Sequence, residues 1–431
     1  MKEMIRILLV VFIFSFCAVA QDDMQAFILK LLQKPPESTP ELRQKTFLEV
    51  WETVKTKHYD GTFNGVDWEK VREKYAPKVA KTEGNEQLTE VLNDMLNELG
   101  VSHNAVINRS EIAKGYNSEP ADLGFKLKWI ESQAVITSID ANSPSYNAGL
   151  RQGFVIKEFD GVLVSKIVEE KNRRTINGRV GKLLPGEIGT KVNLVYLNEA
   201  GKTKNATIER IKAKGDLIKL FGVAPTYVWV DSRKLDTDIG YISFSGFLGV
   251  DEKVVNAINS MINAPAIILD LRNNRGGNSM EANSIANMFF DQMTVFSKIK
   301  TRKGIEMWES GIALPSKNNF KGILVILVNK ESSSASEALS SGLQDLGRAT
   351  IVGETSTGSL LAGSTKVLLN GNVQMYTEMA PVTPKGNLIE GKGVVPDIEI
   401  KLTRKMLLKG GDPQLEAAVK FIKKKLTKKE K

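Results

Sequence analysis

Cysteine and histidine are nearly absent from this sequence. Its 431 residues contain one cysteine, Cys17, and two histidines, His58 and His103. This scarcity excludes a disulfide framework, a cysteine-based zinc site and a multi-histidine metal site. Any chemistry that needs an imidazole must therefore use one of these two histidines. No segment after residue 20 is long and apolar enough to span a bilayer, so we expect no stable membrane span.

The first 20 residues have the pattern of a cleaved signal peptide. Lys2 and Arg6 precede a short apolar run over residues 7–16, and Ala18-Val19-Ala20 then supplies the small residues of a cleavage site. The run is shorter than the ~20 residues that a membrane anchor requires. We therefore predict a signal peptide over residues 1–20, cleavage before Gln21 and a periplasmic or secreted protein.

The composition is that of a folded, soluble protein with an uneven distribution of charge. Charged residues make up 25% of the chain and hydrophobic residues 42%, which excludes general disorder. Much of the basic excess lies from Lys420 onward, where seven lysines accompany one glutamate. Because the rest of the chain has no basic stripe with interleaved aromatics, we expect no nucleic-acid partner. We interpret the tail as a solvated helix end in preference to a surface that binds lipid or cell wall.

Three regions follow the signal peptide, each with its own hydrophobic pattern. The early region has helical periodicity, with apolar side chains three and four residues apart before a stop at Gly100. From about Pro120 the pattern changes to short strands separated by turns. After Lys212, apolar strands alternate with helices. The predicted divisions are a helical region (21–115), a small β-rich domain (116–212) and an α/β core with a basic C-terminal helix (213–431).

The alternation after Lys212 predicts a largely parallel sheet with helices on both faces. Strands such as 266–272, which is apolar until its polar end, and 322–328 are typical of such a sheet. Active sites of such sheets lie beyond the carboxyl ends of the strands. This rule selects the turn 273–277, the turn 329–336 and the stretch after Glu354.

Serines in the turn 329–336 are candidate nucleophiles. A serine between a strand and a helix lies beside helical amides that can stabilise an oxyanion. The alternative is an ordinary helix cap, because serine is a preferred N-cap residue. His103 is a candidate base, whereas His58 is interpreted as a packing or surface residue. Residue types and spacing do not decide which of four acids would orient the imidazole of His103. The four acids are Asp270, Asp345, Glu354 and Glu390.

Three segments in order resemble the carboxyl-terminal processing (tail-specific) serine peptidases. They are DLRNNRGG (270–277), SSSASEALSSGLQDLGRATIVGE (332–354) and IEGKGVVPDIEI (389–400). Segments near residues 47–75 and 93–106 also resemble this family, so the similarity runs from about 47 to 400. The resemblance implies a peptidase core of the crotonase-like type.

The resemblance assigns roles to several residues. Ser334 matches the nucleophile, and the backbone amides of Ala335 and of Gly276 or Gly277 match the oxyanion hole. The lysine base of the common branch is absent, because Ser359 stands at its position. Lys366, the next lysine, does not match.

A tricorn-like branch of the family instead uses a Ser-His pair and a glutamate. Ser102-His103 and Glu390 have the matching places in this chain. The resemblance therefore implies His103 as the base, with Glu390 and Ser102 orienting its ring, and no metal or organic cofactor. Asn104 departs from the family pattern, which usually has threonine after the histidine.

The middle block resembles a PDZ domain, with Leu123, Gly124 and Phe125 in the peptide-binding loop and SPSYNAGLRQG (143–153) as a second signature. Such a domain takes an extended peptide as an added strand. The implied partner is a protein or peptide with a free C-terminus. The missing lysine and the bulk of Arg275 leave one alternative, a non-catalytic peptide-binding protein on a peptidase scaffold.

Overall fold

The computed structural model describes most of the chain. The described ranges are 29–31, 33–111, 119–169, 184, 186–219, 225–235 and 238–429. The predicted signal peptide, Cys17 and the cleavage site before Gln21 lie outside these ranges. Within them, no helix has both the length and the apolar character needed to cross a membrane.

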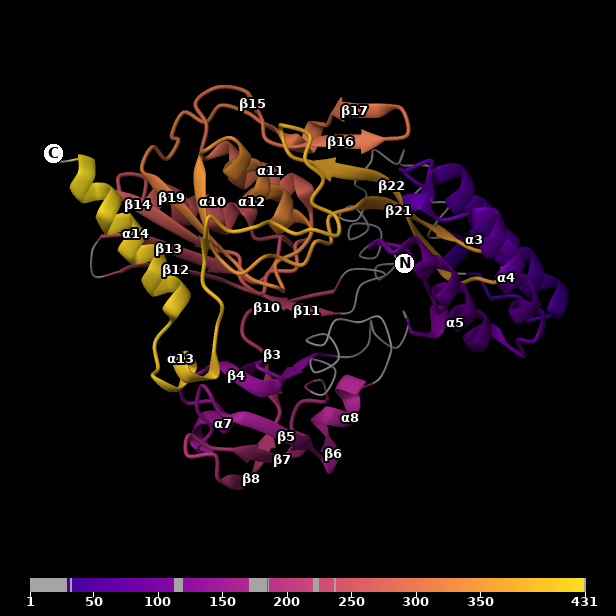
Figure 1. Cartoon of the computed structure of the whole chain (residues 1–431), viewed down its shortest axis with the longest axis horizontal. Helices are drawn as coiled ribbons and strands as arrows, with labels where there is room; N and C mark the ends of the chain where they lie inside the picture. The colour runs from indigo at the N-terminus through magenta and orange to yellow at the C-terminus, as the bar shows by residue number, and fades with distance from the viewer. Residues whose placement is uncertain are drawn as a thin grey trace, which may run out of the picture.

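The early region is helical, as its periodicity predicts, and packs around one apolar cluster (Figure 1). Its elements are α3 (Pro40–Lys57), α4 (Trp68–Ala80), α5 (Asn85–Leu96), the 3₁₀ turns Phe63–Gly65 and Asn97–Leu99, and the strand β1 (Ala105–Ile107). Asp67 caps the N-terminus of α4, because its side chain accepts a hydrogen bond from the Lys70 amide. Gly100 ends the helical stretch with a φ of 66°, a conformation that glycine adopts without strain.

The middle region is built on a six-stranded antiparallel sheet in the order β3-β4-β5-β7-β8, with β6 beside β5. The elements are β2 (Ala121–Asp122), β3 (Phe125–Ile130), β4 (Gln133–Ile139), α7 (Pro144–Asn147), β5 (Val155–Phe159), β6 (Val162–Leu163), α8 (Val164–Glu169), β7 (Lys191–Leu197), β8 (Thr203–Glu209) and β9 (Ile211–Lys212). One sheet face encloses its own core. The other face receives Leu407 from a late helix.

The later part of the chain forms a second six-stranded sheet in the order β12-β13-β14-β19-β20-β23, which is parallel except for β12. Its elements are β12 (Val230–Lys234), β13 (Gly240–Phe244), α10 (Asp251–Ser260), β14 (Ala266–Asp270), α11 (Ser279–Asn287), β19 (Ile323–Val328), α12 (Ala335–Asp345), β20 (Ala349–Gly353), β23 (Ile398–Glu399), α13 (Arg404–Leu408) and α14 (Pro413–Lys429). The predicted alternation of strands and helices is confirmed. The mixed α/β class is confirmed with it.

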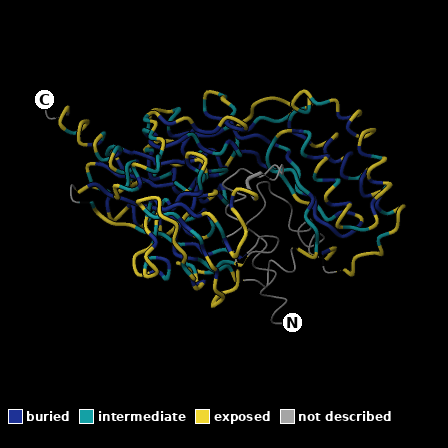
Figure 2. The backbone as a smooth tube through the Cα atoms, turned by 60° about the horizontal axis from the view of Figure 1, so that its bottom comes forward, coloured by how far each residue is buried: buried dark blue, intermediate teal, exposed yellow. Residues whose placement is uncertain are grey.

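Helices cover both faces of this sheet, as the uniformly apolar strands require. In β14, Ile267 and Leu269 pack against α10, α11 and α12. The intervening Ile268 faces the opposite side, where Ala418 and Ile422 of α14 are buried. Figure 2 shows the buried backbone of the sheet against the exposed outer side of α14. The predicted C-terminal helix is therefore present, and one of its faces is apolar and buried against the sheet.

A third sheet, which the local sequence pattern does not predict, joins the helical region to the core. Its order is β1-β22-β16-β17, with β21 beside β22. The strands are β16 (Lys298–Thr301), β17 (Gly304–Met307), β21 (Ala362–Val367) and β22 (Val373–Val382); short pairs are β10 (Asp216–Ile218) with β11 (Thr226–Val228), and β15 (Thr294–Val295) with β18 (Ile312–Ala313). Val106 of β1 pairs with Gln374 of β22. Such a long sequence separation leaves no local signal of the pairing.

Candidate active site

Three turns meet at the carboxyl ends of β14, β19 and β20, where sheet topology predicts a site. The amide of Asn273 donates to Asn329 Oδ1 at 3.1 Å, and Asn329 Nδ2 donates back to Asn273 Oδ1 at 3.1 Å. The Thr357 amide donates to the carbonyl of Ser332 at 3.0 Å. These contacts fix the two predicted turns and the stretch after Glu354 against one another.

Ser334 lies at the junction of β19 and α12 in a strained conformation. Its φ is 56° and its ψ is −121°, a region that non-glycine residues rarely adopt. Such a conformation costs about 1–3 kcal/mol and persists only where its surroundings impose it. A strained turn between a strand and a helix is the setting of known serine nucleophiles.

Gly276 approaches Ser334 so closely that a side chain would not fit. A Cβ atom at this position would lie 2.7 Å from both Ser334 Cβ and the Ala335 nitrogen, and the φ of Gly276 is 85°. The Gly276 amide already donates to Asn274 Oδ1 at 2.9 Å. By contrast, the amides of Gly277 and Ala335 have no acceptor among the residues that the structure describes. Of the two glycines considered from sequence, Gly277 thus has the available donor.

Glu337 connects the turn 329–336, which carries Ser334, to the stretch that follows β20. The Glu337 side chain is fully buried, and its Oε2 accepts from the amides of Ser334 and Ser359, both at 3.0 Å. Its Oε1 accepts from Ser356 Oγ at 2.5 Å and from the Gly358 amide at 2.6 Å. Burial raises the pKa of Glu337, whereas these four donors oppose the rise.

A second cluster brings together Ser102, His103 and Glu390. Ser102 Oγ lies 2.6 Å from His103 Nδ1 and 3.0 Å from Glu390 Oε2. The Ser102 amide also donates to Glu390 Oε1 at 2.6 Å. His103 has a φ of 57°, so the candidate base and the candidate nucleophile both have backbones in the left-handed half of conformational space. Glu390 therefore reaches the imidazole through the hydroxyl of Ser102.

Residues 359 and 360 connect this cluster to the turn of Ser334, the candidate nucleophile. The Leu360 amide donates to Glu390 Oε2 at 2.7 Å, and the carbonyl of Ser359 accepts from the Ser334 amide at 3.1 Å. Ser359 occupies the place where the resembling family would have lysine. The same two residues thus contact both the turn of Ser334 and the carboxylate that holds Ser102.

Burial shifts the two titratable groups of the cluster in opposite directions. It lowers the pKa of His103, because the charged imidazolium is poorly solvated there. It raises the pKa of Glu390, although the hydrogen bonds from Ser102 and Leu360 oppose the rise. The neutral imidazole is therefore favoured, which is the form that can accept a proton.

Comparison with known proteins agrees with this geometry. Residues 238–400 match Peptidase family S41, and residues 40–97 match the Tricorn protease C1 domain. The chain contains a peptidase domain of family S41. Its relatives and its fold place it among the carboxyl-terminal processing serine proteases, which are hydrolases, and the resemblance seen in the sequence is confirmed.

Two curated relatives are similar to this S41 peptidase over most of its length. "Carboxyl-terminal-processing peptidase 3, chloroplastic" of Arabidopsis thaliana is 26% identical, over 83% of this chain and 68% of that protein. "Carboxyl-terminal-processing protease" of Picosynechococcus sp. is 28% identical, over 82% of both chains. Among solved structures, the photosystem II D1 C-terminal processing protease has a TM-score of 0.59 and 25% identity, over 85% of this chain and 96% of that one.

The other acids considered from sequence have different neighbours in this S41 peptidase. Asp270 accepts from Arg272 and Tyr241, and Asp345 accepts from the Lys385 amide at 2.8 Å. Glu354 is buried and makes no side-chain hydrogen bond to a described residue. Of the four candidates, Glu390 is the one that contacts Ser102.

The lysine and the second histidine also have other neighbours. Lys366 Nζ pairs with Glu49 Oε1 of α3 at 2.9 Å and lies 3.4 Å from Thr53 Oγ1. His58 is buried at the end of α3 with its Nδ1 against the backbone of Asp60, in agreement with a packing role. Arg275 is exposed and pairs with Glu331 at 3.1 Å.

The loop proposed for peptide binding lies at the start of β3. Leu123 and Phe125 point into the core of the middle region. The Gly124 amide donates to Asp122 Oδ1 at 2.9 Å, so it already has an acceptor. In the described part of the middle sheet, β3 is a terminal strand with one unpaired edge.

Sequence reasoning missed the contribution of Glu337, although a signal for it exists. Ser334 and Glu337 have the serine-x-x-glutamate spacing of a capping box. No comparable signal marks the Leu360 amide, because a backbone donor is independent of residue type. Among the described residues, no cluster of three or more histidine, cysteine, aspartate or glutamate side chains could hold a metal ion.

Proposed function

We propose that this S41 peptidase is an exported endopeptidase of the tail-specific type, which cleaves through an acyl-enzyme on Ser334 with His103 as the base. One observation carries the proposal. His103 Nδ1 is held by Ser102, Ser102 is held by Glu390, and Glu390 is held by the Leu360 amide beside the nucleophile turn. Lys366, the next lysine in the sequence after Ser359, pairs with Glu49, which argues against it as an alternative base.

The hydrogen-bond partners determine which nitrogen of His103 acts. An ionised Glu390 carries no proton, so the Ser102 hydroxyl donates to Glu390 and accepts from Nδ1–H. This arrangement leaves Nε2 with a lone pair for the proton of Ser334. In a serine triad, the third residue orients the imidazole and stabilises its charged form. Ser102 and Glu390 together take that part here.

The reaction then follows the two steps of acyl transfer. Ser334 Oγ attacks the scissile carbonyl as Nε2 takes its proton, and the imidazolium returns that proton to the leaving amine. Water, activated by the same Nε2, hydrolyses the ester. The amides of Ala335 and Gly277 serve the oxyanion, and loss of such a donor costs about 2.7–4 kcal/mol in the barrier.

The middle region, residues 116–212, recognises the C-terminus of the substrate as a PDZ domain. The unpaired edge of β3 can accept an extended peptide as an added strand. The core after residue 213 belongs to the crotonase-like type in this proposal. The signal-peptide pattern over residues 1–20 supports a periplasmic or secreted location.

Labelling with a serine-directed phosphonate tests the nucleophile. We expect covalent labelling and loss of peptidase activity, and we expect Ser334→Ala to abolish both. Ser333→Ala is the matched control, because this neighbouring serine donates to the carbonyl of Arg275. Labelling that survives in Ser334→Ala would refute the assignment. Peptide binding without labelling or turnover by the unmodified protein would favour a non-catalytic site.

A further inference from the structure

Tyr59 packs beside the segments that carry Ser102, Leu360 and Glu390, and no role was assigned to it from the sequence. The ring is 4% exposed and packs with Val101, Leu361, Ala380 and Leu388. Each of three of these residues is close in sequence to a group of the cluster. Val101 precedes Ser102, and Leu361 follows Leu360, whose amide donates to Glu390. Leu388 lies two residues before Glu390. The phenol thus packs on the chain neighbours of every group that holds the imidazole.

The hydroxyl of Tyr59 is available as a donor. It has no acceptor among the described residues, and burial followed by the charges of Glu390 and Asp60 raises the pKa of Tyr59 to about 12. The phenol therefore keeps its proton at any pH at which the peptidase works. Glu390 accepts from the Ser102 amide, the Ser102 hydroxyl and the Leu360 amide, which leaves room for one more donor on a carboxylate with about four lone-pair sites.

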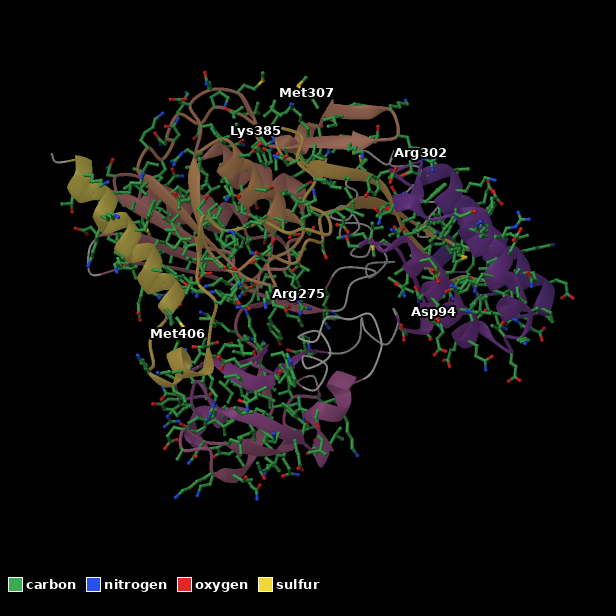
Figure 3. The ribbon with its side chains drawn as sticks, in the orientation of Figure 1. Asp94, Arg275, Arg302, Met307, Lys385 and Met406 are labelled. Atoms are coloured by element: carbon green, nitrogen blue, oxygen red, sulfur yellow. The ribbon has the colours of Figure 1, made fainter. Side chains whose placement is uncertain are left out.

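The segment that carries Tyr59 is anchored from the peptidase core. Arg302, between β16 and β17, donates from Nε to the carbonyl of His58 at 2.5 Å and from a terminal nitrogen to the carbonyl of Lys55 at 2.7 Å. Figure 3 shows Arg302 where the β16–β17 hairpin meets α3. On the other side, Asp60 accepts from the Thr62 and Asn64 amides, both at 3.0 Å. The tyrosine is thus held from both chain directions.

We propose that Tyr59 is a positioning residue of this peptidase, which closes the Ser102–Glu390 pair off from water and stabilises the ionised Glu390 through its hydroxyl dipole. The proposal rests on the assignment of His103 as the base. When Glu390 is ionised, the Ser102 hydroxyl donates to it and can therefore accept a hydrogen bond from His103 Nδ1–H. A group that favours this state acts on the imidazole without contacting the substrate.

The test compares Tyr59→Phe with the unmodified protein over a range of pH. Phenylalanine keeps the ring and its packing but removes the dipole, so the pKa of Glu390 should rise further. We expect the acid limb of kcat/KM to move to higher pH, with KM unchanged. On the plateau, kcat should fall about 3- to 10-fold, which is less than the loss expected when an acid–base group itself is removed. Tyr75→Phe, on α4, is the control and should leave the profile unaltered, because the Tyr75 hydroxyl donates to Glu98 Oε1 at 2.8 Å and Tyr75 belongs to neither proposed site.

A purely structural role would give a different result. In that case Tyr59→Phe would show the parent pH profile, and that outcome overturns the proposal. Tyr59→Leu, which also removes part of the ring, should shift the limb at least as far as Tyr59→Phe, and thermal unfolding monitors its folding. If phosphonate labelling of Ser334 is absent from the unmodified protein, the proposed function fails; if labelling is present and the profiles coincide, only the role of Tyr59 fails.

Discussion

The residues of the candidate site combine strained backbones with buried polar groups. Ser334 and His103 both have positive φ values, and the close approach at Gly276 excludes any side chain there. Buried polar groups of this kind are stable only when they are hydrogen-bonded. Glu337 and Glu390 meet this requirement with four and three donors respectively. The strain at Ser334 is thus supported by a network that extends well beyond the reacting atoms.

The pH dependence of activity should identify the base. His103 must be neutral to accept the proton of Ser334, and burial lowers its pKa below the usual value of about 6.5. Activity should therefore be flat through neutral pH and fall only as the pH drops below about 6.5, with loss of the Glu390 charge adding to the decline. The measurement is kcat/KM across pH. Activity that appears only in the alkaline range would indicate a lysine base.

At the scale of elements, each part of the site depends on a contact between two segments distant in sequence. The strand β1 follows His103 directly and pairs with β22, whereas the helix α12 follows Ser334 and packs beneath the parallel sheet. The strand β21 is tied to α3 by Lys366 and Glu49. Strand pairing and an ion pair thus attach the helical region, which carries His103, to the part of the chain that carries Ser334.

Replacing Lys366 separates a structural lysine from a catalytic one. Because Lys366 pairs with Glu49, we expect Lys366→Met to keep activity within about 2-fold and to reduce stability by at most about 1 kcal/mol, as is usual for partly exposed pairs. Enzyme assays and denaturant unfolding measure the two effects. Glu49→Gln breaks the same ion pair and is the matched control for stability. A loss of activity comparable to that of His103→Ala would show that Lys366 takes part in the reaction.

At the scale of the whole molecule, the C-terminal segment connects the core to the middle region. Leu407 of α13 is buried against Ile130, Val135 and Val155 of the middle sheet. Arg404 donates to the carbonyls of Gly153 and Asn198 at 3.0 and 2.8 Å. The chain then returns to the core as α14. The middle region is therefore attached to the core by packing as well as by its two chain connections.

Removing the Leu407 side chain should loosen this attachment. The loss of such a buried side chain costs about 2–5 kcal/mol in packing. In Leu407→Ala we expect faster hydrogen exchange in α13 and in β3 to β5, with turnover of a small ester by Ser334 preserved. Lys405→Ala, an exposed change in the same helix, should leave exchange as it is. Unchanged exchange in Leu407→Ala would show that α13 does not hold the middle region.

Local patterns in the sequence were sufficient for most elements of the fold. The helical stripe that ends at Leu99 and the apolar strands of the core are both effects of neighbouring residues, and the structure confirms both. The same patterns identified the carboxyl ends of β14, β19 and β20 as the place for a site. His103 and Glu390 were candidates from residue type alone, whereas Ser102 and, among the clustered serines, Ser334 were selected through resemblance to a family.

Only the tertiary structure decided how these parts meet. The contact of Glu390 with Ser102 joins residues 288 positions apart, and Tyr59 packs with Leu361 and Ala380, which are still farther away along the chain. The sheet that joins β1 to β22 was not predicted for the same reason. Hydrophobic periodicity reports which face of a segment is buried, whereas the partner of that face is set by the global arrangement of the chain. The sequence therefore determined the elements and the chemistry available, and the folded chain determined which groups come into contact.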